Sequence, residues 1–199
     1  STSEKWEPVA PTAGDGDMIG PVSAVDGHLA VFDGTTGKLL KDGGGIPSGS
    51  GAYICLQDQK TQGTAGGTFT SGAWRTRALN TELADTGNNA SLSSNQITLS
   101  AGSYRCRITC PAAYVERHQA RLYNVTDGET ILVGTSARAQ GSLGRLTQNN
   151  SEIVGRFTLA VEKTIEVQHI CESSRSDDGF GEYSNFSTEI FTVAEFWKE

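Results

Sequence analysis

Short segments in which apolar and polar residues alternate with a period of two constrain the fold of this chain most strongly. In residues 104–110 the apolar members share one face and the polar members the other: Tyr104, Cys106, Ile108 and Cys110 against Arg105, Arg107 and Thr109. Such alternation predicts a β-strand that is buried on one side. Similar segments lie at residues 118–123, 130–133, 152–160 and 164–171, and no segment has the period of an amphipathic helix. Asp127-Gly128 fits a hairpin turn between the first two. We therefore expect an all-β sandwich or jelly roll.

The last apolar segment, residues 188–197, differs from the others because it carries apolar side chains on both faces. These are Ile190, Phe191, Val193, Phe196 and Trp197. A strand that is apolar on both faces is covered on both faces. One cover would be the sandwich core, and a neighbouring subunit could supply the other.

Composition changes sharply near residue 51. Residues 1–51 hold 11 of the 24 glycines and four of the five prolines, whereas residues 52–199 hold most of the apolar residues. Asp-Gly pairs recur at Asp26, Asp33 and Asp42, between short apolar stretches. Asp-Gly favours tight turns, so we expect tiny strands that are marginal alone and need neighbouring copies. The sequence thus predicts a Gly-rich shaft or attachment segment (1–51) followed by a jelly-roll head (52–199), with a flexible linker as the alternative for the shaft.

Net charge excludes some partners. The formal charge is −7, so nucleic acid is not an expected partner, because phosphate contacts need a basic patch. No apolar run approaches the roughly 18 residues of a membrane-spanning helix, and no secretion signal stands at the start of the sequence. We expect no membrane insertion.

The cysteines and histidines offer no site for chemistry. Cys55, Cys106, Cys110 and Cys171 lack the spacing of a zinc site, and free, buried thiols are the favoured interpretation, with a bridge from Cys171 to Cys55 or Cys106 left open. His118 and His169 share strand parity with apolar residues, which predicts satisfied core histidines, with a general base or metal ligand as the alternative. His28 falls in the shaft and is expected to be structural. No catalytic motif is present. We expect no enzyme activity, no cofactor and no metal.

Two loops are better candidates for binding, because a rigid sandwich positions its end loops. The first covers residues 135–145 and includes Arg138; the second covers residues 173–185. The candidate ligand-binding residues are Arg138, Arg175, Asp177, Asp178, Phe180 and Tyr183. Asp and Arg can hydrogen-bond sugar hydroxyls, and aromatic rings can stack on a sugar ring. Solvated loops without a ligand are the alternative, as is a Ca²⁺ or sugar site at Asp177-Asp178.

Several of these segments resemble a known family. The stretch GPVSAVDGHLAVFDGTTGKLLKDGG (residues 20–44) resembles a segment of tailed-phage tail fibre proteins. Residues 67–82, 97–105, 118–128, 179–181 and 192–199 resemble the C-terminal domains of phage fibres. Those heads resemble the trimeric jelly roll of the C1q and tumour-necrosis-factor type, through AGSYR (101–105) and the aromatic last strand.

The resemblance implies a receptor-binding protein of the phage tail. It implies a homotrimer in the virion, assembled in the host bacterial cytoplasm, with the N-terminal segment attached to other virion tail proteins. The head would recognise the host surface, and a bacterial cell-surface glycan is the expected ligand. The alternatives are a structural virion decoration or tail-tip protein that contacts only other virion proteins, and a glycan hydrolase or esterase that uses Asp177 and Asp178.

Overall fold

A computed structural model describes residues 28–33, 39–45, 51–141 and 147–199. The chain divides into two compact units, Ser1–Gly49 and Ser50–Glu199. The expected turn at Asp26, the residues after Asp33 and the end of the first candidate loop (residues 142–145) lie outside the described residues.

In the described residues of the first unit, β1 (His28–Asp33) and β2 (Leu39–Gly45) form an antiparallel pair. The short apolar stretches predicted as tiny strands do form strands. The turn predicted at Asp42-Gly43 is wrong, because β2 continues through both residues and Asp42 lies opposite Ala30. Phe32 is 57% exposed, and a lone two-stranded pair is marginal in water.

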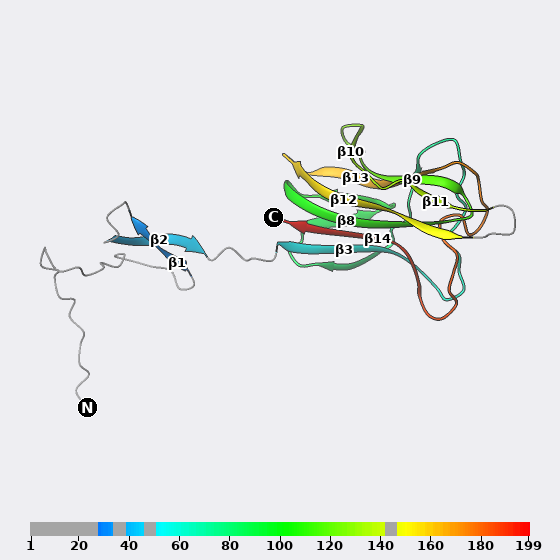
Figure 1. The fold of residues 1–199 in the computed structure, drawn as a ribbon. Helices are drawn as coiled ribbons and strands as arrows, with labels where there is room; N and C mark the ends of the chain where they lie inside the picture. The colour runs from blue at the N-terminus through cyan, green and yellow to red at the C-terminus, as the bar shows by residue number, and fades with distance from the viewer. Residues whose placement is uncertain (1–27, 34–38, 46–50, 142–146) are drawn as a thin grey trace, which may run out of the picture. The chain divides into compact units, whose positions relative to one another are not determined.

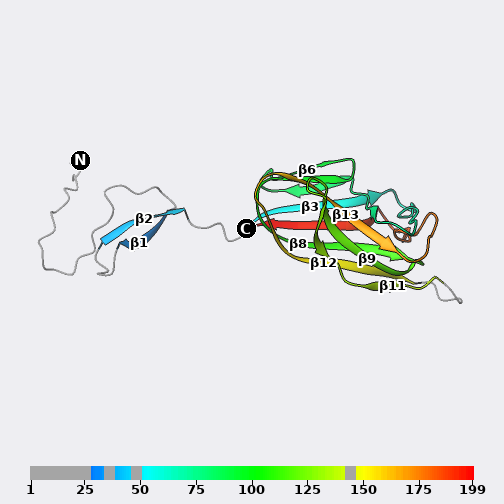
Figure 2. The same ribbon diagram turned by 90° about the horizontal axis from the view of Figure 1, so that it is seen from above.

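The second unit, hereafter the head, is a sandwich of two antiparallel sheets (Figures 1 and 2). One sheet has five strands in the order β12-β8-β14-β3-β5. The other has seven strands, in the order β10-β9-β13-β7-β6, with β11 beside β9 and β4 beside β13. The strands are β3 (Ala52–Lys60), β4 (Arg75–Thr76), β5 (Thr81–Asp85), β6 (Ala90–Ser93), β7 (Gln96–Leu99), β8 (Gly102–Ala113), β9 (Glu116–Asn124), β10 (Glu129–Val133), β11 (Ala137–Ala139), β12 (Gln148–Leu159), β13 (Lys163–Cys171) and β14 (Glu189–Lys198).

The faces that the strands bury are the ones that the alternation of apolar and polar residues predicts. Tyr104, Cys106, Ile108 and Cys110 of β8 all lie in the core, and the arginines between them are exposed. The hairpin turn at Asp127-Gly128 joins β9 to β10 as predicted, with Gly128 at φ 74°, where glycine is unstrained. The predicted all-β, jelly-roll type of head is confirmed. Within the described residues no helix could span a membrane.

All four cysteines are free and buried, so the favoured interpretation of the thiols is confirmed and the two alternative bridges do not form. Burial raises the pKa of Cys106, Cys110 and Cys171 to about 11. A thiolate at neutral pH is therefore disfavoured at these three positions.

The interior also contains polar side chains that the alternation of apolar and polar residues does not predict. Arg77 is buried, and its guanidinium donates to Thr192 Oγ1 (2.8 Å), Pro111 O (3.0 Å) and Phe180 O (3.1 Å). His118 and His169 lie in the core as predicted, 3.0 Å apart from Nδ1 to Nε2.

The expectation that both core histidines would be satisfied is wrong in part. His118 Nε2 and His169 Nδ1 are buried and have no hydrogen-bond partner among the described residues. Diagonal pairing of β9 with β13 places the two rings side by side, so each uses one nitrogen on the other. Burial next to Arg77 lowers the pKa of His118 to about 4 and that of His169 well below its usual value.

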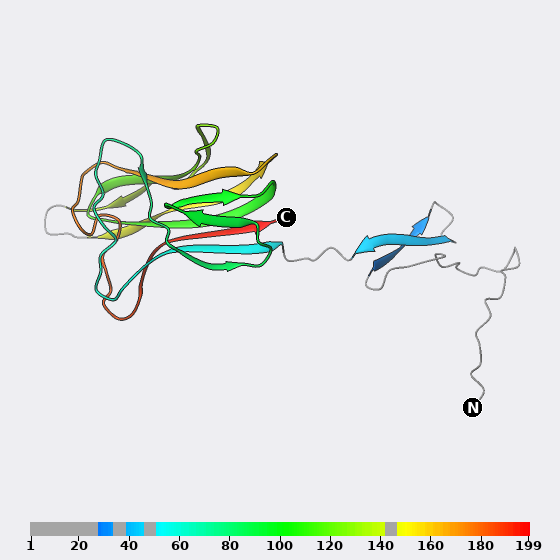
Figure 3. The same ribbon diagram turned by 180° about the vertical axis from the view of Figure 1, so that it is seen from behind.

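The loops before β4 and between β13 and β14 lie at one end of the head, and the C-terminus lies at the other (Figures 1 and 3). A small second core of Phe69, Ala112, Val115, Ala139 and Cys171 packs at the loop end. Backbone hydrogen bonds between Phe69 and Arg175 tie the two loops together.

Candidate ligand-binding site

The turn from β8 to β9 holds two residues in a conformation that side chains rarely adopt. Tyr114 has φ 60° and Glu116 has φ 62°, and positive φ at residues other than glycine is strained. The Tyr114 amide donates to Thr147 O (3.2 Å), its hydroxyl donates to Glu182, and the Gly141 amide donates to Glu116 Oε1 (3.1 Å). Strained residues that their surroundings hold in place cluster at binding sites.

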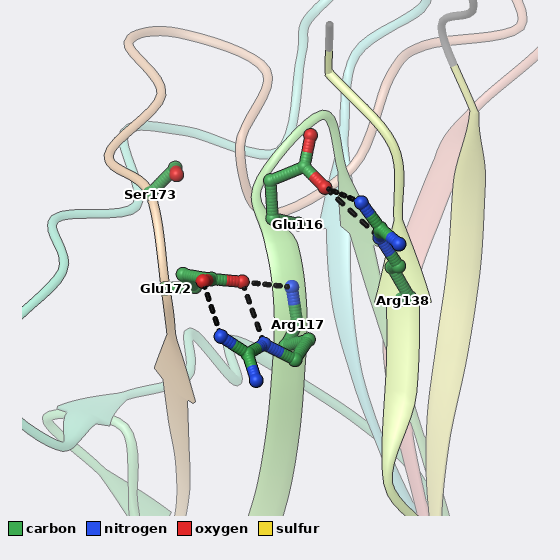
Figure 4. A pocket seen from close by; sticks show the side chains of 5 residues that line it. All are labelled: Glu116, Arg117, Arg138, Glu172 and Ser173. Carbon is green, nitrogen blue, oxygen red and sulfur yellow. Dashed lines mark hydrogen bonds and ion pairs between the residues drawn. The ribbon is translucent and has the colours of Figure 1, made fainter.

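Two arginine–glutamate pairs stand side by side next to this turn (Figure 4). Arg138 of β11 donates through Nε (2.9 Å) and Nη2 (2.8 Å) to Glu116 Oε2. Arg117 donates through Nε to Glu172 Oε2 (2.9 Å) and through Nη2 to Glu172 Oε1 (2.6 Å). The hydrogen bonds from Arg117 lower the pKa of Glu172 to about 2, so both partners are charged at neutral pH.

These four side chains and Ser173 line a depression of about 550 Å³, which we call the charged hollow. A second hollow of about 340 Å³ adjoins it and shares Arg117 and Glu172. Its other lining residues are His118, Gln119, Ser136, Ala137, Ile170 and Cys171. The Arg117–Glu172 pair therefore borders both hollows.

The charged hollow offers donors and acceptors in equal measure. Each guanidinium presents several fixed N–H donors, and each carboxylate presents acceptors only. A hydroxyl can donate to one and accept from the other, so neighbouring hydroxyls on one molecule match a paired Arg and Glu. The ion pairs themselves are exposed at Arg117 and Arg138 and contribute little to stability.

Of the six residues singled out from the sequence, Arg138 is the one that lines the charged hollow. Ser173, at the start of the second candidate loop, lines it as well. The structure thus brings parts of both predicted loops to one depression.

The other five lie in different surroundings. Arg175 and Asp178 form an ion pair (Nε to Oδ1 2.6 Å, Nη2 to Oδ2 3.0 Å) inside their loop. Phe180 stacks on Phe69, with ring centres 4.3 Å apart, and also packs on the Arg77 guanidinium. Asp177 is exposed at φ 65°, and Tyr183 is 47% exposed.

Sequence reasoning missed Glu116, Arg117 and Glu172. The predicted strands began at His118 and ended at Cys171. Arg117 and Glu172 flank those two positions directly, and Glu116 lies one residue further out. Extending each strand by one residue would have placed Arg117 and Glu172 on the outward face. Glu116 has no such marker, because a positive φ at glutamate is not visible in a pattern of polarity.

In the part of the chain that the structure describes, no three His, Cys, Asp or Glu side chains gather to hold a metal ion. The carboxylate of Asp178 faces Arg175 rather than a second acid. The Ca²⁺ alternative at Asp177-Asp178 thus has no third ligand of these types among the described residues.

Comparisons with known proteins concern the fold. The sequence matches no protein-family model and no curated protein. Among solved structures the chain is similar to the globular domain of zebrafish complement 1qA protein, with 11% identity, a TM-score of 0.43 and coverage of 74% of this chain and 96% of that one. It is also similar to murine APRIL at pH 5.0, with 11% identity, a TM-score of 0.49 and coverage of 75% of this chain and 99% of that one. The structure of murine APRIL at pH 8.5 has 11% identity and a TM-score of 0.43, and the match covers 74% of this chain and 98% of that one.

Proposed function

We propose that this protein is the receptor-binding part of a phage tail fibre, a homotrimer whose head binds a glycan on the surface of the host bacterium without modifying it. The observation that carries the binding role is the charged hollow, where two arginines and two glutamates from three strand ends line one depression. The phage origin rests on the resemblance of residues 20–44 and of the head segments to tail fibre proteins.

Glycan is the ligand class that this chemistry fits. Sugar hydroxyls donate and accept, and the hollow presents guanidinium donors beside carboxylate acceptors. The strained turn at Tyr114 and Glu116 supports a binding role, because strain of this kind persists where a site requires a fixed geometry. The chain's net charge of −7 argues against a phosphate-rich polymer.

The open face of the five-stranded sheet supports self-association. Tyr53 and Trp197 lie 5.5 Å apart there, and Arg105 lies over the Trp197 ring at 4.7 Å. Val154, which pairs with Arg107 on the same face, is 64% exposed. Aromatic and arginine side chains are enriched in protein interfaces, and a second copy would cover them.

Binding without catalysis is consistent with where the titratable groups lie. Both core histidines are buried, with 4% of His118 and none of His169 exposed, and their lowered pKa values hold both rings neutral at pH 7. Asp178 is engaged by Arg175. Hydrolysis of a glycosidic bond usually needs two carboxylates held across a cleft. Asp177 and Asp178 are neighbours in one loop, and Glu116 and Glu172, the two carboxylates of the charged hollow, are each ion-paired with an arginine.

Two measurements test the proposal. The intact chain is expected to bind an array of bacterial surface oligosaccharides and to run as a trimer in light scattering at micromolar concentration. A stable monomer would contradict the trimer. Binding to other tail proteins with no binding to any glycan or host envelope would favour the virion-decoration alternative, and release of reducing ends or acetate would favour the hydrolase.

A further inference from the structure

The outer face of the seven-stranded sheet carries two facing rows of polar and aromatic side chains that continue from the charged hollow. β9 contributes one row and β13 the other, and together they form what we call the sheet-face track: Arg117, Gln119, Arg121 and Tyr123 opposite Glu172, Ile170, Gln168 and Glu166. Gln119 pairs with Ile170, Arg121 with Gln168 and Tyr123 with Glu166. Six residue steps along β9 span about 20 Å.

The first part of the track is hollowed. The second hollow, of about 340 Å³, is lined by Arg117 and Glu172, by Gln119 and Ile170, and by Ser136 and Ala137 at the start of the β11 segment. Ile170 and Ala137 are half-buried. The track therefore begins in a charged depression and continues into one with apolar walls.

The second part of the track is a platform built around Arg121. Its guanidinium lies 4.1 Å from the Trp74 ring centre and 4.4 Å from that of Tyr123. Nε donates to Gln168 Oε1 (2.7 Å) and Nη1 donates to Thr130 Oγ1 (3.0 Å). The arginine is thus fixed between two half-buried rings.

Trp74 links the platform to the hollow. It immediately precedes the pairs Arg75–His169 and Thr76–Gln168, so its register position is beside Ile170, which lines the second hollow. The polar network then runs on across β13 to β7, because Gln168 Nε2 donates to Glu166 and Gln96 Nε2 donates to Glu166 Oε2 (3.2 Å).

Charge along the track and the charged hollow is balanced. Arg117, Arg121 and Arg138 stand against Glu116, Glu166 and Glu172. An acidic or basic polymer gains nothing from such a surface. An added peptide strand is also disfavoured, because the backbone of β9 and β13 is already paired on both sides along most of the track.

From this juxtaposition we propose that the sheet-face track binds an extended, uncharged saccharide chain, with one residue in the charged hollow and later residues over Ile170 and against the Trp74–Arg121–Tyr123 stack. This inference rests on the proposed glycan-binding function and assigns its substrate class and its surface. Ring faces suit the C–H surfaces of sugars, and the Gln119 amide and the ion pairs of the charged hollow suit their hydroxyls. Gln168 and Glu166 are buried and support the platform from below through their hydrogen bonds to Arg121 and Gln96.

Three variants and one array test it. Trp74→Ala removes a ring of the platform, and Ala137→Tyr fills the second hollow. Phe186→Ala is the matched control, since it removes an aromatic side chain that is 89% exposed and lines neither hollow. Each is assayed as the full chain on an array of neutral and uronic-acid-containing bacterial oligosaccharides, after light scattering and thermal unfolding confirm wild-type size and fold.

The wild type is expected to bind neutral chains, and Trp74→Ala and Ala137→Tyr should each weaken that binding by about tenfold or more, as loss of an aromatic anchor does. Phe186→Ala should bind normally. If the wild type binds and neither track variant weakens it, the track is refuted and the proposed function stands. Binding restricted to acidic chains refutes the neutral substrate class. If the wild type binds no glycan, both the track and the proposed function fail.

Discussion

The buried pair His118–His169 makes the head sensitive to acid in a narrow and predictable window. Both rings are buried, they share one hydrogen bond, and no carboxylate contacts either ring among the described residues. The charged group that faces them is Arg77, whose positive charge further lowers the pKa of both rings. The folded head therefore holds the pair neutral, whereas the unfolded chain protonates both near pH 6.5.

The sign follows from which state binds the protons. Because the folded pKa values lie below the unfolded ones, the stability from these groups is complete above about pH 6.5 and falls as pH decreases toward 4. Inside that window each histidine lowers the free energy of unfolding by about 1.4 kcal/mol for every pH unit of acidification, so the pair lowers it by about 2.7 kcal/mol per unit. At pH 5 the head should have lost about 4 kcal/mol relative to pH 7.5, a large part of the stability of an ordinary domain.

The assay is urea unfolding of the full chain at half-unit steps from pH 7.5 to 5. Glu172 and Glu189, whose pKa values are lowered to about 2, lose their contribution only below about pH 4.5 and do not enter this window. In the double variant His118→Leu/His169→Leu the loss of unfolding free energy between pH 7.5 and 5 should disappear. Asp58, whose pKa burial raises, acts with the opposite sign and cannot replace that loss. If the unfolding free energy of the wild type does not change between pH 7.5 and 5, the reasoning is refuted. It is also refuted if NMR detects either imidazole ring protonated in the folded head above pH 5.5.

Three further predictions concern groups that are buried or bonded in unusual ways. Glu189→Gln should destabilise the head by about 2 kcal/mol, because this carboxylate accepts from the amides of Gly63, Ser184 and Asn185; urea unfolding should show no change for the exposed control Glu162→Gln. Arg77→Met should cost about 3 kcal/mol or more, since three buried acceptors lose their donor, and an unchanged midpoint would contradict this. All four thiols should resist a thiol reagent at pH 7.5 until urea unfolds the head, because they are buried; rapid labelling of the folded protein would contradict it.

The fold of the head was accessible from sequence because its strands bury one face each. In β8 the alternation of Tyr104, Cys106 and Ile108 with arginines is complete, so the core face is unambiguous. The same logic correctly placed His118 and His169 inside. It could not show that the two rings meet, because that depends on the register of β9 against β13, which local pattern does not fix.

The candidate site was less accessible for a related reason. Loop position and residue type pointed to the loops of residues 135–145 and 173–185. The first supplies Arg138 to the charged hollow, but in the second Arg175 and Asp178 bind each other and Phe180 packs against Phe69. Residue type alone does not distinguish a side chain that is available to bind a ligand from one whose contacts stabilise its own loop. The residues that line the hollows come from strand ends, and they meet only because β11, β9 and β13 are neighbours.

The two open faces of the sandwich divide the proposed roles between them. If copies associate through the face that carries Tyr53, Trp197 and Val154, the opposite sheet with Trp74 and Arg121 stays open in every copy. Three tracks per trimer could then bind separate chains on one surface, and joint binding can exceed single-site affinity by about 10²-fold or more without a new contact. A weak single site would therefore suffice for firm attachment to a bacterial surface.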